Sequence, residues 1–373
     1  MDRHALGAAG PLLLLLSACG GGGGDGGGSG SVVVAPTAPS QGTSGTPATP
    51  DAAAPGPTTQ TPSGSPSTGT ASGATPVVDA GAIVVPPTRA EPEPAPAPAP
   101  IIPTDPKRPV VRVTPNTLGA ALAAATGGET IQLTRGDYGR IELRGRRFAA
   151  GLVIEAPADA ELSISLQEVD GVTLRGGTLA HARGAGPLGY GANILDSRNI
   201  VFDGVAATDS TRGVVINRSQ DITLLNISLY GLRSDGIDIA ASQRVIVDGA
   251  TCENFSPADG DHPDCIQAWS VGDNIVSDVL ITNVRVEGTM QGIFFGNGDE
   301  GGFDRVRIID NVVVAGFGNG VGVYDCRACE LIGNRVSTFP GSPNQSRVVM
   351  IRGSVTHRGN SHAAYNGKPA WAD

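Results

Sequence analysis

The hydrophobic positions between about residues 110 and 355 come in short runs that alternate with polar positions. The runs recur at intervals of about 22 to 29 residues, and each repeat contains a segment of the same form. These segments are RGVVI, DGIDI, DCIQA, QGIFF and NGVGV, which begin at residues 212, 235, 264, 291 and 319. Alternation with a period of two inside such a repeat predicts a β-solenoid, whose turns bury a continuous core only when they stack.

A second strand-like segment precedes each of these segments and ends in a polar turn residue. The turn residues are Asp203, Asn226, Asp248, Asn283, Asn311 and Asn334. Stacked turns bring equivalent residues into line, and side-chain amides in line can hydrogen-bond along the axis. We therefore expect the asparagines to form an internal ladder at one corner of the solenoid.

The repeat region begins with an Ala- and Leu-rich stretch from Thr117 to about Ala125, which predicts an amphipathic helix that caps the first coil. Gly127 and Gly128 end the helix, and TIQLTRGDY follows as the first coil. This arrangement resembles the right-handed parallel β-helix proteins of the pectin-lyase-like superfamily, which include polysaccharide lyases and polygalacturonases. The resemblance implies an all-β, single-stranded right-handed parallel β-helix over residues 108–355, with a C-terminal tail or cap at residues 356–373.

The first 107 residues have a different composition. Leu12–Leu16 form an apolar run, and the four residues that end at Cys19 read Leu-Ser-Ala-Cys. This quartet resembles the lipobox of bacterial lipoproteins, so we expect residues 1–19 to be a signal peptide and Cys19 to be lipidated. Residues 20–107 are rich in Gly, Pro, Ala and Thr, which predicts a disordered tether. The resemblance implies export and a lipid anchor in the bacterial outer membrane, facing the periplasm or the cell surface.

The charge balance limits the partners and the chemistry. The formal net charge is −10, which argues against a nucleic-acid partner. Separately, we expect the protein to be a monomer. The only lysines, Lys107 and Lys368, flank the repeat region. A lysine is therefore excluded as a catalytic base within the solenoid.

Four cysteines follow Cys19 in the sequence. Outside the cytoplasm they can form disulfides, and we expect Cys265 to pair with Cys252 rather than to act as a nucleophile. The pair Cys326 and Cys329, spaced as CxxC, is open between a disulfide and a redox or metal pair.

Aligning the strands places equivalent residues of successive coils about 4.8 Å apart. If Ile237 and Ile266 face the core, an outward patch spans two coils. This patch is expected to contain Asp235, Asp238, Asp264 and Gln267. The loop NFSPADGDHP is expected to bring Asp261 and His262 over it. Like charges this close are unfavourable unless a cation lies between them or one carboxyl keeps its proton. A metal site, an acid/base pair, and simple neutralisation of Asp235 by Arg212 are all open.

The segments SDGIDI and GDHPDCI resemble the TDGIDI and GDDCI motifs of polygalacturonase-type glycoside hydrolases. The match implies that Asp235 and Asp264 act as acid and base, with Asp261 as a third carboxylate. Gln291 stands where that family has a histidine, and the arginine and lysine of its next coil are missing. An inverting hydrolase is therefore the alternative and not the first expectation.

The resemblance to polysaccharide lyases implies a different assignment, which we expect first. These enzymes commonly hold Ca²⁺ on aspartates, bind a uronate carboxylate through it and remove the acidified α-proton with a basic side chain. The calcium ligands are expected to be Asp235, Asp238, Asp261 and Asp264. The candidate bases are Arg212, Arg233 and His262, and the ordinary pKa of histidine suits general base catalysis. The substrate is expected to be an acidic, uronate-containing polysaccharide.

Four further residues are candidates for contacts with a sugar: Gln267, Trp269, Gln291 and Phe294. Aromatic faces stack on pyranose rings, and side-chain amides hydrogen-bond to hydroxyls. A non-catalytic glycan-binding or adhesion module would use the same residues, so it remains an alternative from another class.

Overall fold

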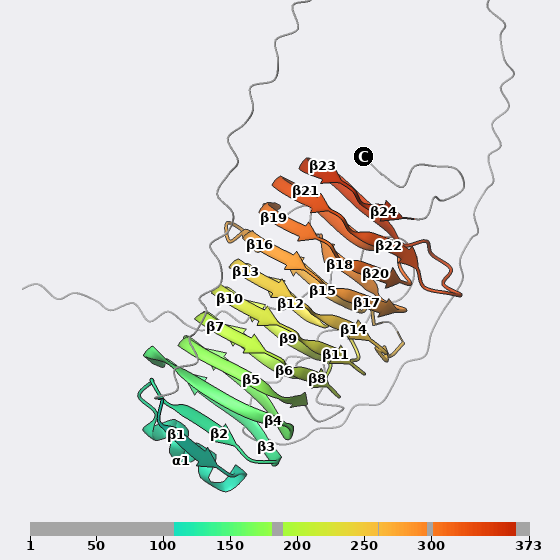
Figure 1. Ribbon diagram of the computed structural model, residues 1–373. Coiled ribbons are helices and arrows are strands. Elements are labelled where there is room, and N and C mark those ends of the chain that lie inside the picture. The colour runs from blue at the N-terminus through green and yellow to red at the C-terminus, as the bar shows by residue number, and fades with distance from the viewer. Residues whose placement is uncertain (1–107, 181–188, 260, 297–300, 363–373) are drawn as a thin grey trace, which may run out of the picture. The chain divides into compact units, whose positions relative to one another are not determined.

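The computed structural model describes residues 108–180, 189–259, 261–296 and 301–362 (Figure 1). The expected signal peptide, the expected lipidation site Cys19 and the tether lie outside the described residues, as do residues 363–373 of the expected C-terminal tail or cap. Residues 356–358 and 361–362 of that segment instead belong to the last two strands. Within the described part of the chain, no helix is long and apolar enough to span a membrane.

In these described residues the fold consists of one helix and a single parallel β-solenoid (Figure 1). The helix α1 is Pro115–Ala124. The strands are β1 (Val110–Val113), β2 (Thr130–Leu133), β3 (Gly136–Arg144), β4 (Arg147–Gln167), β5 (Asp170–Ala180), β6 (Tyr190–Leu195), β7 (Arg198–Asp203), β8 (Ala206–Thr208), β9 (Arg212–Asn217), β10 (Gln220–Leu225), β11 (Ser228–Tyr230), β12 (Ile237–Ala240), β13 (Gln243–Asp248), β14 (Thr251–Glu253), β15 (Asp264–Trp269), β16 (Val276–Thr282), β17 (Arg285–Gly288), β18 (Gln291–Phe295), β19 (Phe303–Ile309), β20 (Val312–Ala315), β21 (Asn319–Ile332), β22 (Arg335–Thr338), β23 (Arg347–Arg358) and β24 (Ser361–His362).

The strands stack in three parallel ladders, one for each face of the solenoid. One ladder runs from β7 through β10, β13 and β16 to β19. A second runs from β8 through β11, β14, β17 and β20 to β22. The third runs from β6 through β9, β12, β15 and β18 to β21. The expected solenoid is therefore confirmed, and the third ladder carries the candidate site.

The core is built from the inward residue of each coil, as the alternation of apolar and polar positions predicts. Val214, Ile237, Ile266, Ile293 and Val321 follow one another in register along the third ladder, and each is fully buried. Burial of one such side chain contributes about 1.5 to 3 kcal/mol relative to an exposed one. The stability of the stack therefore comes from these inward columns.

Helix α1 begins after Thr114, with Pro115 at its first position, where a missing backbone N–H costs little. Leu118 and Leu122 are buried in the same core cluster as the first strands. The expected N-terminal capping helix is confirmed, with an earlier start than the sequence pattern indicated.

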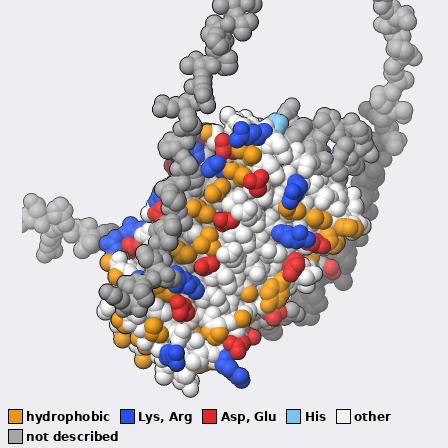
Figure 2. All heavy atoms as spheres, viewed as in Figure 1, with side chains coloured by type: hydrophobic (Ala, Val, Ile, Leu, Met, Phe, Trp, Pro, Cys, Tyr) orange, Lys and Arg blue, Asp and Glu red, His pale blue; other side chains and the backbone are white. Residues whose placement is uncertain are grey.

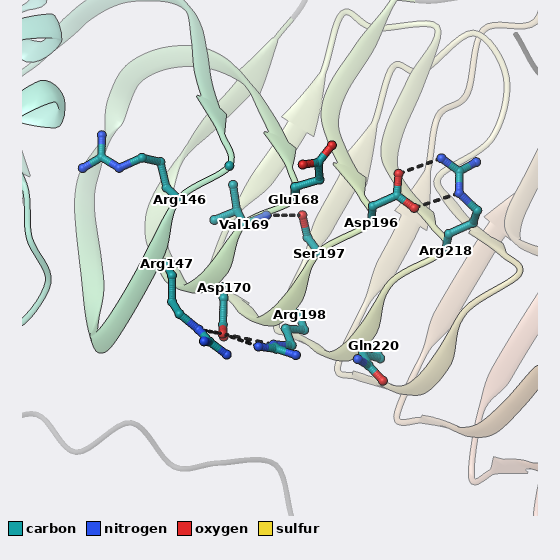
Figure 3. Close-up of a pocket in the computed structure, with 11 residues that line it drawn as sticks. Arg146, Arg147, Glu168, Val169, Asp170, Asp196, Ser197, Arg198, Arg218 and Gln220 are labelled. Carbon is teal, nitrogen blue, oxygen red and sulfur yellow. Dashed lines mark hydrogen bonds and ion pairs between the residues drawn. The ribbon is translucent and has the colours of Figure 1, made fainter. Parts of the chain in front are cut away.

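Ladders of polar side chains line two corners of the solenoid. The hydroxyl of Ser197 accepts from the backbone N–H of Val169, and Ser219 and Ser242 repeat this contact on the next two coils, with N···O distances of 3.0 Å each (Figure 3). Asn311 and Asn334 form an amide ladder at another corner, where the Nδ2 of Asn311 donates to the Oδ1 of Asn334 at 2.8 Å.

The expected asparagine ladder is therefore only partly correct. Asn226 and Asn283 are exposed and have positive φ angles of 52° and 55°, so they lie one residue before the inward position that Asn311 occupies. Asparagine tolerates the left-handed region better than most residues, which explains its presence at the exposed position.

Ion pairs join neighbouring coils on the outside. Asp196 accepts two hydrogen bonds from Arg218, and Asp170 lies between Arg147 and Arg198 (Figure 3). These residues line an open cavity of about 300 Å³, which contains none of the candidate site residues. Acidic and basic side chains of the described residues are interspersed across the face in Figure 2, with no extended basic patch.

Candidate functional site

The polar residues expected to form one patch do come together on the third ladder. Asp238 pairs with Gln267, Asp264 with Gln291, and Tyr190 with Arg212 along the stack. Asp235 lies two residues before β12, and its Oδ1 accepts a hydrogen bond from the backbone N–H of Asp264 at 3.1 Å. The predicted register of the two coils is confirmed.

A corner in the backbone explains how these residues share one side. A polar residue followed by a small one stands at the start of β9, as Arg212-Gly213, and just before β12, as Asp235-Gly236. A Cβ atom added to Gly236 would lie 2.5 Å from the carbonyl oxygen of Cys265, so the coils approach too closely for a side chain there. Because the chain turns at this corner, Asp235 reaches the same guanidinium as Asp238, although simple alternation would separate them.

Burial of the carboxylates is the main departure from the expected patch. Asp235 is 2% exposed, and Asp238 and Asp264 are fully buried. The Nε of Arg212 lies 3.1 Å from the Oδ2 of Asp235 and 3.3 Å from the Oδ2 of Asp238. The prediction of an exposed acidic patch was therefore wrong, since alternation shows which side of a strand a residue faces and not what covers that side.

Three buried carboxyls beside one guanidinium cannot all carry a charge. Burial raises the pKa of Asp264 to about 7. Burial also raises the pKa of Asp238 well above its ordinary value, and the neighbouring Asp235 carboxyl raises it further. Burial raises the pKa of Asp235 as well, although Arg212 opposes this effect. Burial of these carboxyls therefore favours the retention of protons in the site, and Asp238 is the carboxyl for which two causes act in this direction.

His262 is the most accessible ionisable group of the site. Its side chain is 52% exposed, whereas that of Arg212 is 17% exposed. The Nδ1 of His262 lies 3.7 Å from the Oδ2 of Asp264, and this carboxyl raises the pKa of the imidazole. The ring of Phe317 packs edge-on against the imidazole at 5.0 Å between centroids. We refer to Arg212, Asp235, Asp238, His262 and Asp264 as the Asp–Arg–His cluster.

Two contacts hold the loop before β15 (residues 254–259 and 261–263). One lies before His262 in the sequence and the other after it. Arg233 donates two hydrogen bonds to Asp261, at 2.7 and 3.2 Å, which lower the pKa of the Asp261 carboxyl. The disulfide Cys252–Cys265 closes the base of the loop. Arg233 was expected as a candidate base. In the structure its guanidinium instead forms an ion pair with Asp261, which is not a member of the Asp–Arg–His cluster.

Both cysteine pairs of the repeat region are disulfides. The expected pairing of Cys252 with Cys265 is confirmed. Cys326 and Cys329 are also bonded and buried, which resolves the alternatives left open for the CxxC pair.

The four expected calcium ligands do not make a calcium site in this arrangement. Arg212 lies between Asp235 and Asp238, and Asp261 is bound by Arg233. Among the described residues, no group of three or more His, Cys, Asp or Glu side chains is placed to hold a metal ion. A calcium ion needs six to eight oxygen ligands, so the donors present do not fit it, and calcium binding stays a prediction from the resemblance alone.

Three of the four expected sugar-binding residues are accessible on this face. Gln267, Trp269 and Phe294 are partly exposed, and Phe294 packs edge-on against Tyr324 at 5.2 Å. Gln291 is only 3% exposed, because both ends of its amide are engaged by His262 and Asn319.

Tyr190, Asn319 and Tyr324 also join the site, and they were not predicted as site residues. The hydroxyl of Tyr190 lies beside Arg212, and burial raises the pKa of that phenol. The signal that could have identified Tyr190 and Asn319 was their place at the same first strand position as Arg212 and Gln291.

Comparisons with known proteins support the fold. A family model for the "Right handed beta helix region" matches residues 163–340. The alginate lyase from Paenibacillus sp. str. FPU-7 is 16% identical, with a TM-score of 0.49, and the match covers 71% of this chain and 98% of that chain. An endo-xylogalacturonan hydrolase from Aspergillus tubingensis is 14% identical, with a TM-score of 0.45 and coverages of 69% and 94%.

PfbA, a surface adhesin of Streptococcus pneumoniae, is 12% identical, with a TM-score of 0.41 and coverages of 66% and 85%. No curated protein sequence matches the chain. Similarity at this level concerns the fold and carries no information on activity. The stacked parallel coils and the matched family model together show that the chain folds as a right-handed parallel β-helix.

Proposed function

We propose that the protein is a β-eliminating lyase of an acidic polysaccharide, with His262 as the general base. One observation carries this proposal: His262 is the accessible titratable group above a buried carboxylate cluster. Asp264, 3.7 Å away, orients the imidazole and stabilises its positive charge.

The reaction needs a base at the carbon next to a uronate carboxylate. The Nε2 of His262 takes the α-proton, the electrons of the C–H bond form a carbon–carbon double bond, and the glycosidic C–O bond breaks. The imidazolium then returns the proton to the leaving oxygen, so that the two products together have the composition of the substrate. The range in which histidine titrates suits both proton transfers near neutral pH.

The charge state of the cluster removes an objection to an acidic substrate. Three ionised aspartates would repel a uronate. Arg212 compensates the charge of Asp235, the raised pKa of Asp238 keeps a charge off that residue, and the imidazole of His262 lies beside Asp264. The residues of this chain therefore tolerate an anionic sugar.

The same geometry argues against the inverting hydrolase. In that mechanism two carboxyl groups act on opposite sides of the scissile bond, with a water molecule beside one of them. Asp235 and Asp264 are 2% and 0% exposed, and the Oδ1 of Asp235 already accepts a hydrogen bond from the backbone N–H of Asp264. A non-catalytic glycan-binding module is the second candidate, and the partly exposed Trp269 and Phe294 favour it, because aromatic side chains alone can bind sugars.

Export and lipidation at Cys19 are also part of the proposal. They rest on the sequence resemblance to the lipobox and place the solenoid where extracellular polysaccharides are present.

The test is a panel of acidic polysaccharides assayed for unsaturated products and for new reducing ends. The proposal predicts unsaturated products on at least one uronate-containing glycan. His262→Ala should abolish turnover, while His357→Ala, which changes a histidine of β23 outside the cluster, should retain it. Binding without turnover on every glycan would support the binding module instead.

A further inference from the structure

A chain of hydrogen bonds leads across three coils to His262. The hydroxyl of Tyr324 donates to the Oδ1 of Asn319 at 3.2 Å. The Nδ2 of Asn319 donates to the Oε1 of Gln291 at 2.6 Å. The Nε2 of Gln291 lies 3.3 Å from both ring nitrogens of His262. These residues come from β21, from β18 and from the loop before β15.

The chemistry of the amides gives this chain a direction. A side-chain amide donates only through nitrogen and accepts only through oxygen. Because the oxygen of Gln291 receives the N–H of Asn319, its nitrogen must face the imidazole. Tyr324 can donate or accept, and it donates here because it meets the amide oxygen of Asn319. Every bond in the chain therefore points towards His262.

We propose that Tyr324, Asn319 and Gln291 fix the tautomer and the ring orientation of His262. The Oδ2 of Asp264 faces Nδ1 and favours a proton on that nitrogen. A neutral imidazole has one nitrogen that accepts a hydrogen bond. If Nδ1 carries the proton, this nitrogen is Nε2, and the side-chain N–H of Gln291 donates to it. Gln291 is thus a positioning residue, and its earlier assignment as a sugar ligand does not fit its burial.

This inference rests on the proposed function in one respect, which is that the unprotonated Nε2 of His262 is the atom that takes the α-proton of the substrate. In the resting site the N–H of Gln291 occupies the place that the α-proton of the substrate takes at Nε2. The charged groups that face the ring are Asp264 on its own coil and Asp235 on the preceding coil. Phe317 packs against the ring edge and hinders its rotation.

The test uses the full-length protein with ¹⁵N-labelled histidine and reads the tautomer of His262 from its ring nitrogen shifts by NMR. His262→Ala assigns the signals. The wild type should show a protonated Nδ1 and an unprotonated Nε2. In Asn319→Asp the carboxylate can only accept, so Gln291 must turn its nitrogen towards residue 319 and its oxygen towards His262. The proton should then move to Nε2.

Gln291→Met removes the amide at similar volume and should leave a mixture of the two tautomers. Asn193→Asp, a change on the third ladder at β6, serves as the matched control and should leave the wild-type tautomer. Unchanged shifts in both Asn319→Asp and Gln291→Met would overturn the inference. A wild type that carries its proton on Nε2 would overturn it as well.

The turnover number is a second readout, because it would not change if Asn319 and Gln291 had a purely structural role. On a glycan that the wild type cleaves, Asn319→Asp should lower kcat by about tenfold or more with little change in KM. The NMR measurement needs no substrate. If the wild type lacks turnover and yet shows the fixed tautomer, the proposed function fails and the inference stands, whereas turnover with unchanged shifts gives the opposite result.

Discussion

Replacing Asp264 by asparagine should change how the stability of the protein depends on pH. The Asp264 carboxyl is fully buried, and burial raises its pKa from 3.8 to about 7. The folded protein therefore holds a proton that the unfolded chain releases above about pH 4. The stability linked to this group is present below that pH and is lost as the pH rises towards 7.

The size of the effect follows from the shift. One pKa unit corresponds to about 1.4 kcal/mol, so a shift of about three units makes the wild type less stable at pH 7 than at pH 4 by roughly 4 kcal/mol from this group alone. An asparagine does not titrate. The free energy of unfolding of Asp264→Asn, taken relative to the wild type, should therefore rise by about 4 kcal/mol between pH 4 and pH 7.

The measurement is urea unfolding followed by circular dichroism at a series of pH values. Asp170→Asn is a matched control of opposite sign. Burial of Asp170 opposes ionisation, but hydrogen bonds from Asn199, Arg147 and Arg198 outweigh it and lower the pKa to about 2. Its stabilisation is present above about pH 4 and is lost as the pH falls towards 2. Parallel stability curves for the wild type and Asp264→Asn would refute the buried, protonated carboxyl.

The remaining predictions concern the loop and the anchor. Arg233→Gln should release the loop and lower turnover about tenfold to a hundredfold, while the free energy of unfolding changes by less than about 1 kcal/mol; undiminished turnover in a kinetic assay would exclude a positioning role. Replacing Cys252 and Cys265 by serine should lower the free energy of unfolding by about 3 kcal/mol in urea titrations, and an unchanged midpoint would contradict this. Metabolic labelling with a lipid should tag the wild type and leave Cys19→Ala untagged, and tagging of both would refute lipidation at Cys19.

The pattern of apolar residues was sufficient to predict the fold and the register. Ile237 and Ile266 had to face inward in any stacked arrangement, and this alone placed Asp238 beside Gln267. The corner ladder was predicted correctly at Asn311 and Asn334 but not at Asn226, because a left-handed turn residue and an inward ladder residue look alike in the sequence.

The site was harder to predict, because its chemistry depends on contacts across coils. Nothing in the spacing shows that Arg212 reaches both Asp235 and Asp238, or that this contact replaces an expected cation. The pairing of Arg233 with Asp261 depends on how a long loop folds back on the previous coil. Both arginines were predicted from the sequence as candidate bases. In the structure each of them forms ion pairs with aspartate side chains.

The central claim is that the site eliminates and does not hydrolyse. The most direct test is cleavage of a uronate-containing polysaccharide in H₂¹⁸O, with the products examined by mass spectrometry. Elimination adds no water, so the account predicts an unsaturated product without ¹⁸O from the cleavage step, formed by the wild type and not by His262→Ala. One ¹⁸O atom in each cleaved product pair, with no unsaturated sugar, would show hydrolysis and contradict the account.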